Sequence, residues 1–371
     1  MKTQKFLAPV LAFLMALSLT GCGSSAASSA TANASTGTNS SAEAASSGSQ
    51  TTAVDDAFKD GPSITMKYAE EGSDSTARYA AAAHLAEILH ERSGGKITME
   101  LYPNAVMGTA FECVASVEDG QLEMTSFDAG AIMAESLSIL DAPGIFSDLD
   151  VATKVLTGDN DFMKLVDAEY EKLGVKNLFM APACYRMLTT TNKKISTVND
   201  IKGLVVRVPN NSMFIEFWKA MGATTQVISA SETYLALQQG VVDAQENPLD
   251  QCVNVYKFCE VQKYIYNTNH IMAKQCLMMN LDFYNKLPDA YRELLDECVQ
   301  DYGDYYIQAR DTENAALLKD AQTQGAEYIE LSDEYFAAQK KISESVLKDV
   351  RSLSGDTMVD AALAAISEAA K

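Results

Sequence analysis

The sequence predicts a two-lobed α/β protein in which each lobe is an open sheet with flanking helices. Strand-like and helix-like segments alternate over residues 63–127, with short connections between them. The same alternation returns over residues 177–244, and this second set indicates a second lobe. A chain of 371 residues is also long enough for roughly two domains of ordinary size.

The first set has the order β-α-β-α-β. Its predicted elements are a strand at 63–69, a helix at 77–92, a strand at 96–102, a helix at 111–119 and a strand at 122–127. Gly94 and Gly95 end the first of these helices, because glycine readily adopts the left-handed conformation that follows a helix. Short connections in this order predict parallel strands.

The second set is predicted from the same periodicities. Its elements are strand material at 177–187, strands at 203–208, 224–228 and 241–244, helices at 212–221 and 231–239, and long helices from residue 283 to beyond residue 309.

The first 21 residues resemble a bacterial lipoprotein signal peptide. Lys2 and Lys5 form a short positive region, and residues 6–19 are apolar but too short for a comfortable transmembrane span. The segment ends in Leu-Thr-Gly before Cys22, which is typical of a lipobox and predicts a lipidated Cys22. An ordinary secretory signal with a chance cysteine is the alternative, and export follows from both interpretations.

Residues 22–60 are predicted to be the lipidated cysteine and a flexible tether. The stretch is mostly Ser, Ala, Thr, Gly and Asn and cannot bury enough apolar surface to offset its chain entropy. We therefore expect an extracytoplasmic protein that is lipid-anchored to the bacterial membrane, at the cell surface or in the periplasm.

Charge excludes some classes of partner. There are 29 Lys and Arg against 50 Asp and Glu, which gives a net charge of −21. Nucleic-acid binding needs a basic surface that this composition does not provide. Attraction of a polybasic segment to lipid headgroups is excluded on the same ground.

The sequence contains no motif that demands catalysis. GxSxG, HExxH, GxGxxG and Walker A patterns are absent, and the three histidines lack metal-ligand spacing. We therefore expect no enzyme, no cofactor and no metal. Cys252 and Cys259 are predicted on one face of a helix, too far apart for a disulfide, and the six body cysteines are interpreted as mostly buried thiols rather than disulfides. His270 either lines a cleft or is a satisfied structural histidine.

Arg207 is the most informative single residue. It lies in the apolar strand Gly-Leu-Val-Val-Arg-Val-Pro, and a guanidinium beside a core needs a partner. Its planar fork suits a carboxylate. Arg186, in Cys-Tyr-Arg-Met-Leu, has a similar setting. From strand context alone, a ligand carboxylate and an internal Asp or Glu are both open as partners for each arginine.

Ten short motifs follow one another along the chain. They are RSGGKI at 92–97, LYPN at 101–104, MG at 107–108, VEDG at 117–120, DIKGL at 200–204, VRVP at 206–209, MGA at 221–223, ETYLALQ at 232–238, GVVDAQENP at 240–248 and TNH at 268–270. In this order and spacing they resemble the DctP-type solute-binding proteins of TRAP (tripartite ATP-independent periplasmic) transporters. The resemblance runs from about residue 64 to about residue 325, nearly the whole folded body.

The resemblance implies a periplasmic-binding-protein-like fold with two lobes joined by crossing strands and a long helix. Lobe I is then expected at 61–184 plus 273–312, and lobe II at 185–272 plus 313–371. It further implies that Arg207 forms a salt bridge with the ligand carboxylate. By the same resemblance, Arg186 assists and Asn247 hydrogen-bonds the same end of the ligand.

Two acids fall where sugar-acid-binding members of this family contact hydroxyls or amines. They are Glu71, after the first strand, and Asp128, after the third. Because carboxylates accept hydrogen bonds and repel a second carboxylate, they favour a uronate or aldonate over a C4-dicarboxylate. The alternative is that both are solvated rim residues. Sialate-binding members carry an acid where Thr109-Ala110 stands, so sialic acid itself is disfavoured. Tyr68, Phe127, Tyr185 and Phe214 are candidate apolar walls or core residues.

The sequence thus predicts an extracytoplasmic receptor that captures a small organic acid and delivers it to TRAP membrane permease subunits. We expect a monomer. The alternatives are a C4-dicarboxylate receptor of the same system, and a binding lipoprotein of an ATP-driven importer or of a sensor. A secreted hydrolase is the rival from another class.

Overall fold

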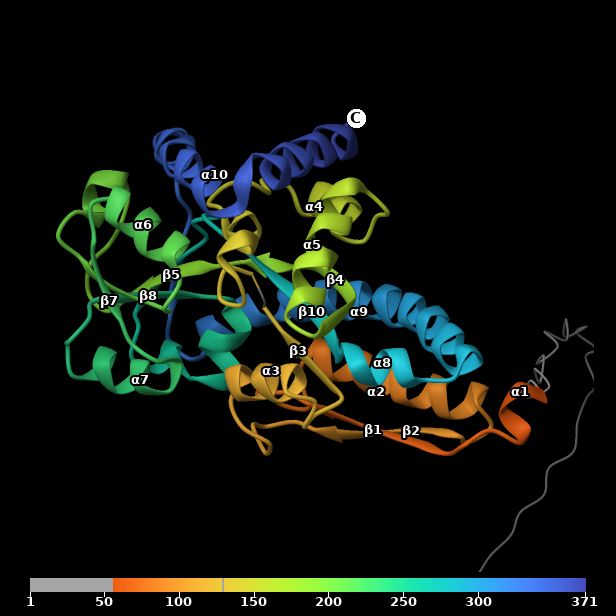
Figure 1. The fold of residues 1–371 in the computed structure, drawn as a ribbon. Helices are drawn as coiled ribbons and strands as arrows, with labels where there is room; N and C mark the ends of the chain where they lie inside the picture. The colour runs from red at the N-terminus through yellow and green to blue at the C-terminus, as the bar shows by residue number, and fades with distance from the viewer. Residues whose placement is uncertain (1–55, 129) are drawn as a thin grey trace, which may run out of the picture. The chain divides into compact units, whose positions relative to one another are not determined.

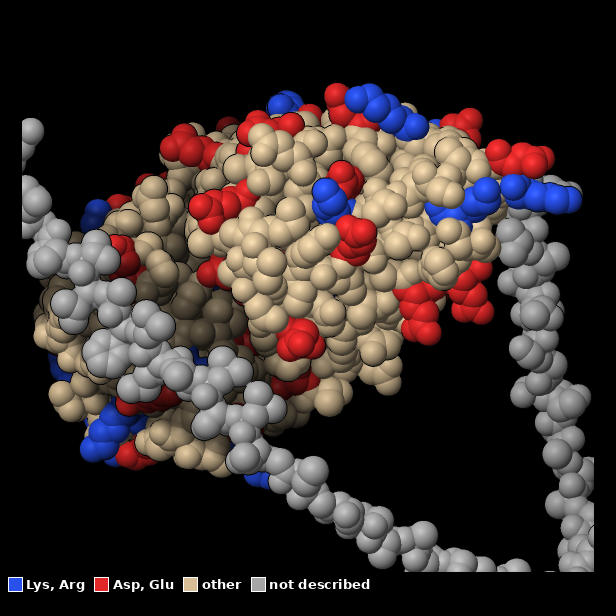
Figure 2. All heavy atoms as spheres, turned by 90° about the horizontal axis from the view of Figure 1, so that it is seen from below, with Lys and Arg blue, Asp and Glu red and all other residues tan. Residues whose placement is uncertain are grey.

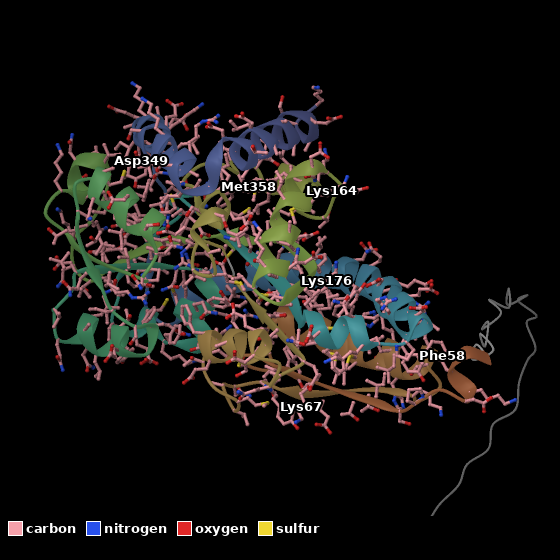
Figure 3. All side chains as sticks on the ribbon, viewed as in Figure 1. Phe58, Lys67, Lys164, Lys176, Asp349 and Met358 are labelled. Carbon is pink, nitrogen blue, oxygen red and sulfur yellow. The ribbon has the colours of Figure 1, made fainter. Side chains whose placement is uncertain are left out.

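The computed structural model describes residues 56–128 and 130–371. The predicted signal peptide, Cys22 and the tether up to residue 55 lie outside the described residues. The described part begins with α1 (Asp56–Lys59), where the buried Phe58 ring lies 4.9 Å from that of Tyr291 (Figure 3). The end of the predicted tether therefore contains a short helix that packs on the folded body. Within the described ranges, no helix is both long and apolar enough to cross a membrane.

Lobe I is built on a sheet with the strand order β2-β1-β3-β10-β4 (Figure 1). Its strands are β1 (Ile64–Ala69), β2 (Ile97–Tyr102), β3 (Met124–Phe127), β4 (Val175–Tyr185) and β10 (Met272–Asn280). β1 pairs in parallel with β2 and β3, as the sequence predicts. β10 is antiparallel to β3 and β4, so the sheet is mixed. β10 comes from lobe II and begins beside the end of β4, so it runs in the opposite direction to β3 and β4. Local periodicity does not show the direction of a strand.

Helices flank this sheet. They are α2 (Ala77–Arg92), α3 (Ala110–Glu118), η1 (Glu135–Asp141), α4 (Leu149–Leu156), α5 (Asp161–Lys172), α8 (Leu281–Lys286) and α9 (Asp289–Thr323). The Thr76 hydroxyl caps the start of α2, and Gly94 follows its end with φ 61°. Thr109 and Glu112 form a capping box at the start of α3. The two N-caps, Thr76 and Thr109, both line the cavity described below.

Lobe II is built on a second sheet with the order β11-β9-β5-β8-β6-β7. Its strands are β5 (Met187–Thr190), β6 (Val205–Val208), β7 (Thr224–Val227), β8 (Ala244–Asn247), β9 (Tyr264–Tyr266) and β11 (Glu327–Ile329). The predicted strand at 241–244 is wrong in its position. Val242 is buried but Val241 is exposed, and pairing starts only at Ala244 and extends to Asn247. The apolar residues Val241 and Val242 lie in the turn before the strand, whereas the more polar residues that follow form the strand.

The helical segments described in lobe II include two α-helices and three short 3₁₀ or π turns. The segments are η2 (Val198–Ile201), α6 (Ser212–Ala220), α7 (Ala230–Gln238), η3 (Gln251–Val255) and η4 (Phe258–Glu260). The predicted single helix carrying Cys252 and Cys259 is wrong, because Lys257 adopts a left-handed φ of 57° and separates a π-helical turn from a 3₁₀ turn. No disulfide joins the six body cysteines to another described residue, and all are buried except the half-buried Cys184, so their interpretation as mostly buried thiols is confirmed.

The two lobes are joined by crossing segments and by α9. β4 continues into β5 across Arg186, and β9 continues into β10 across residues 267–271. α9 packs against α2 and β4 in lobe I and against η3 and β11 in lobe II. The two-lobed α/β architecture predicted from the sequence is therefore confirmed (Figure 1).

The C-terminal helix α10 (Asp333–Ala369) bends at Gly355, which has φ 78°. Figure 3 labels Asp349 and Met358 on the two halves of this helix, and Met358 is buried. α10 contacts η1, α4 and α5 as well as α6 of lobe II. One cluster of buried apolar side chains accordingly spans both lobes and α10. The placement of residues 313–371 in lobe II stays a prediction, because α10 contacts both lobes.

Candidate ligand-binding site

A cavity of about 580 Å³ lies between the two sheets and is lined by residues of both lobes. All five residues predicted to contact a ligand line it: Arg207, Arg186, Asn247, Glu71 and Asp128. Figure 2 shows a recess on the face seen from below, with acidic side chains around it. The fold thus brings together residues that are up to 176 positions apart in the sequence (from residue 71 to residue 247).

Arg207 is a buried cation without an acidic partner among the described residues. It lies on β6, is 3% exposed, and its Nε donates a 2.8 Å hydrogen bond to the carbonyl oxygen of Ile228. Burial lowers the pKa of its guanidinium to about 10, and the nearby Arg186 adds to this, while Glu246 opposes it. The group therefore remains charged at neutral pH and borders the cavity without a counterion.

Arg186, by contrast, has an internal partner. Its Nε lies 2.6 Å from Glu246 Oε2, and its Nη2 donates to Glu246 Oε1 at 3.1 Å. Nη2 also donates to Asn247 Oδ1 at 2.8 Å, and the guanidinium lies 4.8 Å from the centre of the Phe214 ring. The sequence left open a ligand carboxylate and an internal carboxylate as the partner of Arg186, and the structure shows the internal one. The longest contact of Arg186 with an acid is the 3.9 Å between its Nη1 and Asp128 Oδ2.

Glu246 is the centre of a fully buried polar cluster. Burial raises its pKa, but Arg186 and His270 outweigh this and hold the pKa below its ordinary value. His270 Nε2 lies 3.0 Å from Glu246 Oε2, and its Nδ1 lies 2.7 Å from the Thr268 hydroxyl. Burial lowers the pKa of His270. Since His270 is inaccessible to solvent and does not line the cavity, it is a structural histidine.

The amide of Asn247 is held on both sides. Its Oδ1 accepts from Arg186, and its Nδ2 donates to Gln245 Oε1 at 2.6 Å. Asn247 is 7% exposed and lines the cavity. The network fixes the amide orientation, so that one amide hydrogen remains for a partner in the cavity.

Glu71 and Asp128 line the cavity, but protein donors already bind both. Glu71 Oε1 accepts from the Tyr256 hydroxyl at 2.6 Å, which links lobe I to lobe II. Asp128 Oδ1 lies 3.0 Å from Lys274 Nζ and accepts from the backbone N–H of Lys274 at 3.1 Å. Each acid is half-buried and hydrogen-bonded to the protein, and whether either contacts a ligand stays a prediction.

Lys274 is a cavity residue that the sequence analysis missed. It lies in the fully buried strand β10, and its Nζ is 2.7 Å from Asp141 Oδ1. Burial lowers its pKa, but Asp128 and Asp141 outweigh this and raise it. The signal was present, because a lysine in the run Met-Ala-Lys-Gln-Cys-Leu-Met-Met needs a counterion for the same reason as Arg207. Of the candidate walls, Phe127 and Phe214 line the cavity and Tyr68 and Tyr185 do not.

The described part of the chain shows no metal-binding site. No group of three or more His, Cys, Asp or Glu side chains is arranged there to hold a metal ion.

A family model described as bacterial extracellular solute-binding protein, family 7 (DctP), matches residues 68–352. The chain belongs to this family. The DctP fold is also found in a TRAP periplasmic solute-binding protein from Haemophilus influenzae with bound L-gulonate. The two share 26% sequence identity and a TM-score of 0.75, over 82% of this chain and 99% of that one.

Two curated DctP-family relatives extend the comparison. The sialic acid-binding periplasmic protein of Vibrio cholerae is 30% identical over 275 residues, which is 70% of this chain and 81% of the relative. The C4-dicarboxylate-binding periplasmic protein of Rhodobacter capsulatus is 27% identical over 311 residues, 82% of this chain and 92% of the relative. The family is therefore one of solute-binding proteins, and its members differ in the acid that they are named for.

Proposed function

We propose that the protein is an extracytoplasmic receptor of a TRAP transporter that binds a small organic acid between its lobes. Arg207 forms a salt bridge with the ligand carboxylate, and the loaded receptor delivers the acid to the membrane permease. The observation that carries the proposal is a buried, charged guanidinium that borders a cavity and has no acidic partner in the described chain. In this role the protein is a receptor and not an enzyme.

Arg207 can replace the water that a ligand carboxylate loses in the cleft. A carboxylate that enters the cleft loses its water, and a bidentate guanidinium replaces those hydrogen bonds and cancels the charge. Arg207 gains as well, because a counterion removes the penalty that burial imposes on it. Asn247, oriented by Arg186, supplies a further donor at the same wall of the cavity. Arg186 acts mainly by holding this wall in place, since its own charge is balanced by Glu246.

The favoured ligand is a sugar acid such as a uronate or an aldonate. Relatives are named for sialic acid and for C4-dicarboxylates, and a structural neighbour holds L-gulonate. A C4-dicarboxylate is the second candidate, and the Rhodobacter capsulatus relative supports it. Glu71 and Asp128 give this preference only limited support, because both acids already accept hydrogen bonds from the protein.

Membrane attachment forms part of the proposal on sequence grounds. The lipobox before Cys22 and the Ser-, Ala- and Thr-rich segment after it support a lipid-anchored receptor on the outer side of the bacterial membrane, and we propose that this receptor is a monomer. The anchor would keep the receptor near its permease partner while the tether leaves the binding lobes free to open and close.

A ligand screen tests the proposal. Thermal shifts with uronates, aldonates, sialates, C4-dicarboxylates and keto acids identify binders, since a bound ligand stabilises the native state. Calorimetry on each binder then compares the wild type with Arg207→Ala. We expect the variant to lose on the order of 2–5 kcal/mol of binding free energy. Arg351→Ala, which removes a surface arginine on α10, is the matched control and should bind like the wild type.

Two outcomes contradict the proposal. Arg207→Ala would bind the acid as tightly as the wild type, or neutral sugars would bind while every acid fails. The first outcome would show that Arg207 forms no salt bridge with the ligand. The second would show that the ligand is not an organic acid.

A further inference from the structure

One part of the cavity is lined by polar side chains that the sequence did not single out. We call it the polar wall and define it by Arg78, Ser126, Asp250, Gln275 and Glu313. These residues come from α2, β3, the start of η3, β10 and α9. Arg78, Asp250 and Glu313 influence one another electrostatically, so the three charged groups lie close together.

Buried polar atoms at the polar wall are incompletely hydrogen-bonded within the described residues. Ser126 is 2% exposed and lines the cavity, and its Oγ makes only loose contacts, with the hydroxyls of Tyr68 and Tyr302. Glu313 Oε1 is unpartnered, and so is Oε1 of Glu70, which lies behind Arg78. An unsatisfied buried polar group is destabilising and rare in native proteins. Their concentration beside one cavity points to a partner that enters from the cavity.

The charges at the polar wall are not balanced. Arg78 is paired with Glu70, whose Oε2 lies 2.8 Å from the arginine Nε. Arg310, which also lines the cavity, is paired with Asp311 at 2.7 Å. No described lysine or arginine forms an ion pair with Asp250 or Glu313. The wall therefore carries an excess of negative charge, whereas Arg207 carries an unbalanced positive charge elsewhere in the same cavity.

The protonation of Glu313 suits a hydroxyl group. Burial raises its pKa to about 7, and Asp250 and Glu70 add to this, while Arg78 and a hydrogen bond from the Ala77 backbone oppose it. At neutral pH the carboxyl group is then partly protonated and can accept or donate a hydrogen bond. A ligand hydroxyl can do the same, whereas a second ligand carboxylate would meet the Asp250 charge.

We infer that the polar wall binds hydroxyl groups of the ligand and that its unpaired acids exclude a second carboxylate. This inference rests on the proposed function, in which Arg207 binds the single carboxylate. It names the ligand class as hydroxylated monocarboxylates, and it assigns the selectivity to Glu313 and Ser126 rather than to Glu71 and Asp128.

The experiment measures dissociation constants by calorimetry at pH 7.5 for D-galacturonate, L-gulonate and succinate. The wild type is expected to bind at least one of the two sugar acids about ten-fold or more tighter than succinate. Glu313→Gln should reduce that ratio by about ten-fold, because glutamine still hydrogen-bonds hydroxyls but no longer repels the second carboxylate of succinate. Glu293→Gln changes an exposed acid of the same helix α9, outside the cavity, and should leave the ratio unchanged.

A second variant guards against misfolding. Ser126→Ala removes a small hydroxyl that makes only loose contacts with Tyr68 and Tyr302, so its thermal unfolding in the absence of ligand should stay close to that of the wild type. It should weaken sugar-acid binding by about three-fold or more and leave succinate binding unchanged.

The outcomes separate this inference from the proposed function. The inference is overturned if the wild type binds succinate as tightly as both sugar acids. It is also overturned if Glu313→Gln and Ser126→Ala fold natively and keep the wild-type ratio of sugar-acid to succinate affinity, while Arg207→Ala weakens the binding of every acid. The latter result would leave the proposed function standing. If no acid binds, or if Arg207→Ala binds the acids like the wild type, the proposed function fails and the inference fails with it.

Discussion

Arg186 and Arg207 lie in similar sequence settings, yet they have opposite surroundings in the fold. Both are buried among apolar strands and both line the cavity. Arg186 is paired with Glu246 and Asn247, whereas Arg207 has one hydrogen bond to a backbone carbonyl and no carboxylate partner among the described residues. The charge of Arg186 is therefore balanced within the protein, and we propose that a ligand balances the charge of Arg207.

The difference lies in the pairing of the strands that carry the two residues. β8 pairs antiparallel with β5, and this places Glu246 beside the start of β5, directly after Arg186. β8 pairs in parallel with β6, where Gln245 and not Glu246 is opposite Arg207. A side chain one position further along a strand points to the other face of the sheet. Register thus decides which arginine keeps the carboxylate.

The largest expected effect compares the stability of two matched variants. Arg186→Met leaves Glu246 buried without its main counterion and should lower the free energy of unfolding by about 3–5 kcal/mol. Arg207→Met removes a charge that has no acidic partner among the described residues and should leave this free energy unchanged or raise it. Urea denaturation of both variants measures the difference, with Arg351→Met as the surface control. Equal destabilisation by the two cavity variants would contradict the contrast between a paired and an unpaired arginine.

A smaller effect is expected where the lobes touch. Tyr256→Phe removes the hydrogen bond to Glu71 across the cleft and should weaken acid binding about three- to ten-fold, because the closed arrangement loses one contact. Tyr234→Phe removes a similar tyrosine–glutamate hydrogen bond, to Glu260 on the surface of lobe II. It should bind acids like the wild type. Equal affinities for all three proteins would show that the Tyr256 contact does not favour the closed form.

The smallest expected effect is a pH dependence of stability from the Glu246 cluster. Because burial lowers the pKa of His270, the unfolded chain takes up a proton near pH 6.5 before the native state does. Stability is therefore full above that pH and falls as the pH is lowered through it, by about 1 kcal/mol or less per pH unit near pH 6. Glu246 acts in the same direction at lower pH, since its native pKa lies below the ordinary value.

Denaturation curves at pH 7.5, 6.5 and 5.5 measure this dependence. His270→Gln keeps a donor for Glu246 but cannot titrate, so its stability should vary less over this range. The exposed His90→Gln should retain the wild-type slope. A wild-type slope in His270→Gln would mean that the burial of this histidine does not control the pH dependence.

Much of the fold followed from local pattern. The alternation in 63–69 and 96–102 predicted β1 and β2, and their parallel pairing followed from the helix between them. Local pattern could not give the direction of β10, which returns from the other lobe. It also misplaced β8, where the apolar residues are in the turn and the polar residues Gln245, Glu246 and Asn247 form the buried strand.

The five residues that the sequence singled out all line the cavity, but their partners in the protein were not predicted. A buried arginine in a strand signals a need for a counterion, and that argument selected Arg207 and Arg186. It could not say which of them has an internal partner, because Glu246 is 60 residues from Arg186 and meets it only through sheet register. The same argument applied to Lys274 would have found the ion pairs with Asp128 and Asp141. Glu313 gave no signal, since it is one acid among many on a long helix.

A crystal structure with a bound acid tests the central claim most directly. The protein is crystallised with the tightest binder of the screen, and the contacts of its carboxylate are read from the density. The account predicts both carboxylate oxygens within about 2.7–3.2 Å of the terminal nitrogens of Arg207. Asn247 is expected beside them, and the pair between Arg186 and Glu246 should stay intact. A carboxylate bound elsewhere in the cavity, with Arg207 left without an anionic partner, would contradict it.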